Sequence, residues 1–170
     1  MTADYIACSL TRPRGPFPYR RYLCVPNVSW GLDLSGEADL LALSDANYLT
    51  EIEIKISVAD FRRDAGKSKH RQPFWPGRVD LVSAFYYAMP ATMPSKIASD
   101  FPFERAGLIT VNEYGIASVI QKAPARPCRK LTDAERAQLG RLGTMRYWTR
   151  LSHKLDLQQR ESFASESAGR

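Results

Sequence analysis

Cysteine, histidine and long apolar runs are all scarce in this chain of 170 residues. The three cysteines, Cys8, Cys24 and Cys128, lie far apart, no C-x-x-C occurs, and His70 and His153 are equally isolated. This spacing argues against a disulfide framework and a structural zinc site and is typical of reduced cytoplasmic thiols. No apolar run approaches the roughly 20 residues that cross a bilayer, and the N-terminus lacks a basic segment followed by an apolar one. We therefore expect a cytoplasmic protein without a membrane segment.

Lysine and arginine are missing from one stretch, Gly31 to Glu53, where six acidic residues lie, although the whole chain has a net charge of +6. Basic residues are frequent on both sides of this stretch in the sequence. Residues 122–160, for example, include ten basic and three acidic residues. The pattern favours a polyanion held by a basic rim around a central metal site. An ordinary surface of mixed charge is the alternative.

The composition, 44% hydrophobic and 25% charged, is that of a globular protein long enough for one conventional core. Three prolines, Pro13, Pro16 and Pro18, predict an irregular basic arm over residues 1–21 rather than a helix. The polar C-terminus predicts a disordered tail over residues 159–170. One folded domain is expected between them, over residues 22–158.

Hydrophobic periodicity and turn residues divide this domain into its elements. Strands are expected over residues 22–25, 37–43, 48–56, 83–88, 106–111 and 116–121, and helices over 57–71 and from 133 to about 157, with a short helix after Pro90. Gly140 and Gly143 are candidate break points in the last helix. Tyr147 and Trp148 are expected in the core, and stacking on nucleic-acid bases is the alternative for them. The order predicts a mixed sheet flanked by helices, of the α/β or α+β class.

Two acidic strands follow one another in the sequence. Glu51, Glu53 and Lys55 alternate with isoleucines, the period-2 pattern of a strand with one apolar and one charged face. If this strand forms a hairpin with the preceding one, Asp39, Glu53 and Lys55 converge on one spot. Two carboxylates and an ammonium group form a divalent-metal site with a cationic helper, suited to cutting a phosphodiester. The alternative is a solvated strand face with surface ion pairs.

Magnesium prefers oxygen ligands at about 2.0–2.1 Å and keeps several waters, so one or two carboxylates suffice. Asp39 and Glu53 are the candidate ligands, and the backbone carbonyl of Ile54 is a candidate third. Lys55 would orient or deprotonate the attacking water, or neutralise charge in the transition state. The sequence leaves these roles of the lysine open.

The helix expected after the charged strand carries the candidate DNA contacts. Ser57 is a suitable N-cap, and cationic residues follow on the face opposite the apolar stripe. The candidate phosphate-binding residues are Arg63, Lys67, Lys69, His70 and Arg71. His70 has a second interpretation as a cation at the helix C-terminus, and Trp75 either stacks on a base or packs on the core.

These segments resemble the PD-(D/E)xK nuclease superfamily, and within it the MmcB-like family of bacterial DNA-repair endonucleases, which has relatives in phages. The matching stretches, within residues 22–152, are Asn27-Val-Ser-Trp30, Glu37-Ala-Asp39-Leu-Leu, Glu51-Ile-Glu53-Ile-Lys55-Ile-Ser57-Val-Ala-Asp60-Phe61-Arg-Arg-Asp64, Phe85-Tyr-Tyr-Ala-Met-Pro90 and Ala106-Gly-Leu-Ile. The resemblance implies a restriction-endonuclease-like fold and Mg²⁺- or Mn²⁺-dependent hydrolysis of DNA in a bacterial or phage cytoplasm.

The resemblance also implies roles for single residues. Asp39 and Glu53 would be metal ligands and Lys55 the catalytic lysine. An acidic position that often lies upstream in the superfamily has no secure counterpart in this chain. Glu37 is a candidate for it and a further candidate metal ligand, and Glu51 is a weaker candidate.

The expected function is thus that of a metal-dependent DNA endonuclease in repair or processing, with DNA as partner and a protein partner as a candidate for targeting. The alternative is a catalytically silent module on the same fold that binds nucleic acid or recruits a partner. A metal-dependent RNase or resolvase differs from the endonuclease only in substrate, and the sequence does not separate them.

Overall fold

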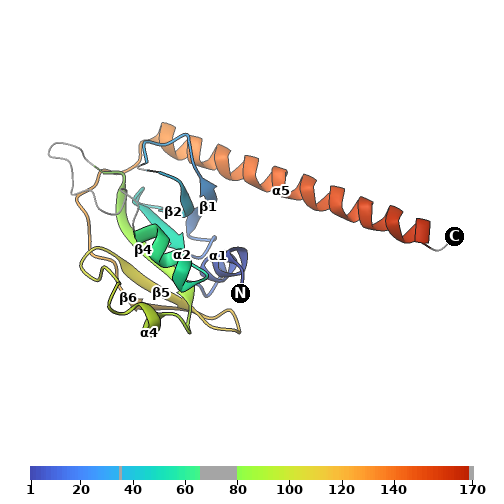
Figure 1. Ribbon diagram of the computed structural model, residues 1–170. Coiled ribbons are helices and arrows are strands. Elements are labelled where there is room, and N and C mark those ends of the chain that lie inside the picture. The colour runs from blue at the N-terminus through green and yellow to red at the C-terminus, as the bar shows by residue number, and fades with distance from the viewer. Residues whose placement is uncertain (35, 66–79, 169–170) are drawn as a thin grey trace.

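A six-stranded mixed sheet forms the centre of the protein in a computed structural model, which describes residues 1–34, 36–65 and 80–168. The strands, in spatial order, are β1 (Tyr22–Val28), β2 (Ala38–Ser44), β3 (Leu49–Ile54), β4 (Val82–Pro90), β5 (Gly107–Val111) and β6 (Ala117–Gln121). Neighbours pair antiparallel from β1 to β3, parallel from β3 to β5 and antiparallel between β5 and β6. This sheet and its flanking helices (Figure 1) confirm the predicted mixed α+β architecture.

Helices cover both faces of the sheet. The helix α1 (Ala3–Thr11) packs on the face that carries Leu40 and Ile52. On the other face, α2 (Val58–Ala65) and α4 (Pro94–Ile97) cover β4 and β5, and the first turns of α5 (Asp133–Ala168) cover β1 and β2. Because side chains alternate along a strand, Leu41 and Asp39 both lie on this second face. The candidate site therefore lies on the same face of the sheet as α2 and α5.

The prediction of an irregular arm is wrong for the first residues, because α1 is a regular helix. The Thr2 hydroxyl oxygen caps it by accepting a hydrogen bond from the Tyr5 N–H at 3.2 Å. Ile6 and Leu10, four residues apart, are fully buried against the sheet. All three prolines of this region come after the helix, so they shape the turn toward β1 and leave α1 intact.

The last helix is longer than the sequence predicts. α5 continues without a break to Ala168, whereas a disordered tail is expected from residue 159 and a break at Gly140 or Gly143. No proline follows Pro127, so nothing in the backbone chemistry forces the helix to end. At Gly143 an added Cβ would lie 3.2 Å from a Val25 methyl group, so this glycine marks the close approach of α5 to β1. No helix in the described ranges has the length and apolar character required to span a membrane.

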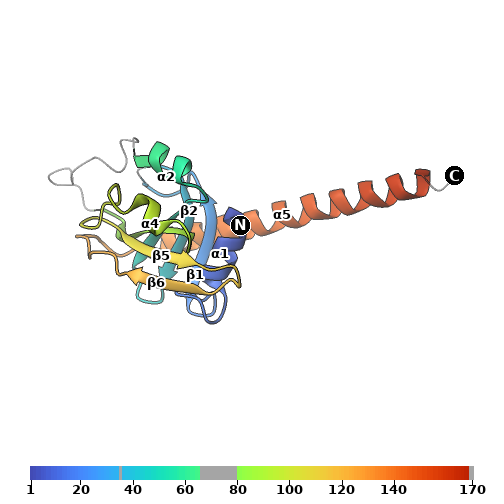
Figure 2. The same cartoon turned by 60° about the horizontal axis from the view of Figure 1, so that its bottom comes forward.

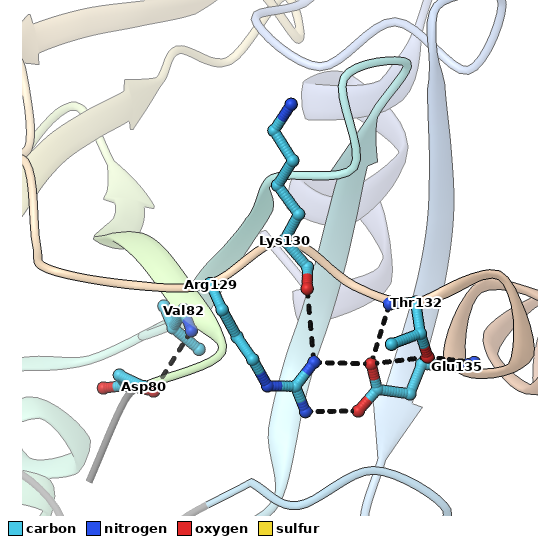
Figure 3. Close-up of polar contacts among 6 residues, drawn as sticks. All are labelled: Asp80, Val82, Arg129, Lys130, Thr132 and Glu135. Atoms are coloured by element: carbon cyan, nitrogen blue, oxygen red, sulfur yellow. Dashed lines mark hydrogen bonds and ion pairs between the residues drawn. The ribbon is translucent and has the colours of Figure 1, made fainter. Parts of the chain in front are cut away.

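A capping box begins α5 (Figure 3). The Thr132 hydroxyl oxygen accepts from the Glu135 N–H at 3.3 Å, and the Glu135 carboxylate accepts from the Thr132 N–H at 2.8 Å. Arg129 donates to both carboxylate oxygens of Glu135, at 2.7 and 2.6 Å. The guanidinium of Arg129 and the two hydrogen bonds from Thr132 lower the pKa of Glu135 to about 2. The start of α5 is therefore fixed by a charged cluster just before its first turn.

Candidate active site

The pairing of β2 and β3 ends next to the candidate carboxylates. The two strands pair as far as Leu40 and Ile52, so one further step of the same register places Asp39 opposite Glu53. At this point the Oδ2 atom of Asp39 accepts a hydrogen bond from the backbone N–H of Ile54 at 2.7 Å. The carboxylate of Asp39 thus replaces a main-chain acceptor at the end of the ladder and is held against β3.

The same geometry orients the candidate carbonyl ligand. The backbone N–H of Lys55 points toward β4 and donates to the carbonyl of Ala88 at 2.9 Å, whereas that of Ile54 points toward Asp39. The N–H and C=O of one strand residue point to the same side of the strand. The Ile54 carbonyl therefore points to the side of β3 on which Asp39 lies. This orientation is necessary if the carbonyl and the Asp39 carboxylate are to bind the same metal ion.

Glu53 and Lys55 form a buried ion pair. The Lys55 Nζ atom lies 2.8 Å from Glu53 Oε1, and each residue is only 4% exposed. Glu51, two residues earlier on the same face, is 7% exposed. The alternative of a solvated strand face is wrong, because all three of these charged residues are buried. Removing two charged groups from water costs several kcal/mol per ion. Only a close ion pair, such as this one, offsets a cost of that size.

Apolar clusters on either side shield this row of charges. On the β4 side, Phe85 and Tyr87 stand next to Glu51 and Glu53 in the parallel register. Phe61 of α2 packs edge-on against Tyr87, with ring centroids 5.1 Å apart. Electrostatic interactions are stronger in such an environment than in water. The site can therefore exert a large effect on a charge that develops beside it.

A further cation near this row was not predicted from the sequence. Arg126 is half-buried, donates to the carbonyl of Arg105 at 2.8 Å and lies 5.3 Å from the centre of the Phe85 ring. Burial lowers the pKa of Arg126, and the carboxylates of Asp80 and Glu51 act in the opposite direction. Glu51 thus has a guanidinium as a neighbour. Arg126 lies in a proline-rich segment without periodicity, which offers no pattern by which to find it.

Comparison with known proteins assigns the chain to a family. A family model described as "DNA repair protein MmcB-like" matches residues 19–158. The chain belongs to the MmcB-like family. No curated protein matches it. A solved structure, a protein of unknown function from Silicibacter pomeroyi, is similar with a TM-score of 0.59 and 22% identity, over 93% of this chain and 94% of the other. That likeness shows a shared fold.

The donor set of this MmcB-like protein fits a hard divalent cation. Carboxylate and carbonyl oxygens are the ligands that Mg²⁺ and Mn²⁺ accept, and two carboxylates suffice when waters complete the shell. A carboxylate has about four lone-pair positions, so a carboxylate can accept a hydrogen bond and bind a metal ion at the same time. Within the described residues, no group of three or more acidic, histidine or cysteine side chains could hold a metal. Glu37 precedes β2 and is exposed.

The candidate DNA contacts of the MmcB-like protein are only partly described. The helix α2 begins as predicted, with the Ser57 hydroxyl accepting from the Asp60 N–H at 3.1 Å. Arg63 is exposed on this helix, 3.9 Å from the Asp60 carboxylate. The other four candidates and Trp75 lie outside the described residues; these four are Lys67, Lys69, His70 and Arg71.

The expectation that Tyr147 and Trp148 lie in the core is wrong. They are 61% and 59% exposed, and their rings contact each other edge-on at 5.4 Å. The last residues of α5 that are buried against the sheet are Leu139 and Leu142. The aromatic pair comes after the point where α5 leaves the sheet, so no apolar layer is present to receive it.

Proposed function

We propose that this MmcB-like protein is a Mg²⁺- or Mn²⁺-dependent endonuclease that hydrolyses phosphodiester bonds of DNA during repair. The observation that supports the proposal is the register of β2 and β3, which sets Asp39 opposite Glu53 where the two strands stop pairing. Asp39 is held by the Ile54 N–H at 2.7 Å, and Glu53 is held by Lys55 at 2.8 Å. Membership of a DNA repair family supports DNA as the substrate.

The residues of the site would have different roles in hydrolysis. Asp39, Glu53 and the carbonyl of Ile54 would hold the metal ion, which supplies a Lewis acid and lowers the pKa of a bound water. Lys55 places an ammonium group beside the reacting phosphate, where it orients water or neutralises charge that develops in the transition state. The shielding by Phe85 and Tyr87 strengthens this contribution.

A cleavage assay on circular DNA tests the proposal, because only an endonuclease can cut a substrate that has no free ends. Supercoiled plasmid and circular single-stranded DNA are incubated with Mg²⁺, Mn²⁺ or EDTA, with an RNA of similar length in parallel. We expect metal-dependent cutting of a circular DNA by the wild type and at least a hundredfold less by Glu53→Gln. Glu113→Gln, which alters an exposed carboxylate in the β5–β6 turn, is the matched control and should cut normally.

The alternatives give different outcomes in the same assay. If the wild type binds DNA and cuts nothing in any metal, the silent binding module is correct. If it cuts RNA alone, the site is that of an RNase. Equal cutting by wild type and Glu53→Gln would remove Glu53 from the mechanism and overturn the proposed site.

A further inference from the structure

The second half of α5 projects from the body of the protein (Figures 1 and 2). The helix has 36 residues, which at 1.5 Å each span about 54 Å. Residues 144–160, here called the C-terminal arm, follow the last leucine that is buried against the sheet. Every residue of the C-terminal arm except Arg146 and Leu151 is exposed. A helix segment with so little tertiary support is positioned to contact something outside its own domain.

The C-terminal arm is strongly cationic on one side. It has four lysine and arginine residues and a single carboxylate, Asp156. At 100° per residue, its basic side chains fall within a sector of about 120°. These side chains are Arg146, Arg150, His153, Lys154 and Arg160. Trp148 and Leu155 lie on the opposite half of the helix. The four lysine and arginine side chains thus form one cationic stripe along the arm, in which Arg150 also pairs with Asp4 of α1 at 2.8 Å.

The C-terminal arm leaves the sheet at the candidate active site. Arg146 donates to the backbone carbonyl of Asn27 at 2.6 Å. The register of β1 with β2 pairs residues 26 and 28 with 40 and 38, which places Asn27 opposite Asp39. Adjacent strands lie about 4.8 Å apart. The root of the cationic stripe is therefore one strand away from the backbone of a candidate metal ligand.

We propose that the C-terminal arm is a DNA-binding element whose cationic stripe holds the phosphate backbone next to the carboxylates at the end of β3. The arm covers about 25 Å, or roughly seven base pairs at 3.4 Å each. Its positive charge also offsets the acidic stretch between Gly31 and Glu53, which by itself repels DNA. Delivery of DNA to the carboxylates rests on the proposed function, whereas binding by the arm does not.

The test measures binding of a labelled 30-base-pair duplex and a single-stranded oligonucleotide by fluorescence anisotropy, in EDTA and across a range of salt. The variant Lys154→Gln/Arg160→Gln removes two cations that lie beyond the last contacts of the arm with the body. The control Lys96→Gln/Arg105→Gln removes one lysine and one arginine that are exposed near α4 and β5, away from the β1 edge of the sheet that α5 covers. Trp148→Ala alters the opposite face of the arm.

We expect the arm variant to bind at least one of the two DNAs about tenfold more weakly, and its salt slope to fall by about 2. The control pair and Trp148→Ala should stay within about twofold of the wild type. Equal losses in the arm variant and the control, or a loss confined to Trp148→Ala, would overturn the proposal. The proposal would also be overturned if the wild type binds anionic lipid vesicles and the arm variant binds DNA as tightly as the wild type does.

Because binding is measured in EDTA, the result does not depend on catalysis. If the arm variant loses DNA affinity and the wild type cuts no DNA with any metal, DNA binding by the C-terminal arm is supported and the nuclease activity is rejected. If the wild type cuts DNA and the arm variant binds and cuts DNA equally well, the nuclease activity is supported and DNA binding by the arm is rejected.

Discussion

The Asp39 carboxylate accepts a hydrogen bond from the Ile54 N–H at 2.7 Å, at the point where the ladder between β2 and β3 ends. One oxygen atom of this side chain thereby completes the main-chain pairing of β3. By the alternation of side chains along paired strands, Asp39 lies on the same face of the sheet as Glu53 and Lys55. A structural hydrogen bond and a candidate metal ligand are thus combined in one residue, and substitutions can separate the two.

We predict that Asp39→Asn keeps the fold and loses the metal. The amide oxygen still accepts from the Ile54 N–H, so the free energy of unfolding should fall by less than about 1 kcal/mol, whereas Asp39→Ala should cost about 1–2 kcal/mol. A ligand that binds the native state at a hundred times its Kd stabilises it by about 2.7 kcal/mol. Thermal unfolding with and without Mn²⁺ should therefore show a rise in Tm for the wild type that Asp39→Asn lacks.

The exposed Asp45 in the β2–β3 turn provides the control for this experiment. Asp45→Asn removes the same charge from the same hairpin and should retain the full rise in Tm with Mn²⁺. A rise of wild-type size in Asp39→Asn would show that Asp39 is not a ligand.

The buried pair of Glu53 and Lys55 should show strong coupling in stability. Either Glu53→Gln or Lys55→Met leaves a buried charge without the group that lies 2.8 Å from it, at a cost of about 3–5 kcal/mol. The double variant removes both charges and should be more stable than either single variant. Urea unfolding of all four proteins measures the coupling energy, and strictly additive costs would contradict it. If the double variant folds well and cuts no DNA, loss of activity is separated from loss of fold.

Part of the site could be predicted because it depends on local patterns. Period-2 alternation places Glu53 and Lys55 on one face, and a hairpin brings Asp39 beside them. Ser57 caps α2 as its chemistry predicts. The burial of Glu53 and Lys55 could not be predicted, because it depends on the tertiary packing of that face of the sheet and not on the pattern of the strand itself.

Other features had no local signal at all. The helix α1 precedes a run of prolines, and its stability comes from Ile6 and Leu10 packing on the sheet, a tertiary effect that composition conceals. Arg126, whose pKa the carboxylate of Glu51 raises, comes from a segment without periodicity. Trp148 has the hydrophobicity of a core residue, and only the departure of α5 from the sheet makes it exposed.

The two glycines of α5 should respond differently to alanine. At Gly140 an added Cβ meets nothing within 4 Å, so Gly140→Ala should raise the free energy of unfolding by about 0.5–1 kcal/mol through helix propensity. At Gly143 the added Cβ lies 3.2 Å from Val25, and the strain offsets some or all of the same gain. Urea unfolding should therefore rank Gly140→Ala above Gly143→Ala. The opposite order would show that α5 does not approach β1 closely at Gly143.

The capping box of α5 makes part of the stability dependent on pH. The pKa of Glu135 is lowered from its usual range to about 2, mainly by Arg129. A carboxyl group whose folded pKa lies below its unfolded value stabilises the protein fully above the unfolded pKa, and this stabilisation is lost as pH falls toward the folded pKa. The contribution of Glu135 should therefore be constant above about pH 5 and decline between about pH 4.5 and pH 2.

Glu135→Gln should accordingly cost about 1 kcal/mol at pH 7, the usual value of a helix cap, and much less near pH 2.5. Urea unfolding of wild type and variant at pH 7, 4 and 2.5 measures this difference. Glu113→Gln gives the effect of replacing an exposed carboxylate outside the cap. A cost of Glu135→Gln that stays the same at all three pH values would mean that the charge of Glu135 does not stabilise α5.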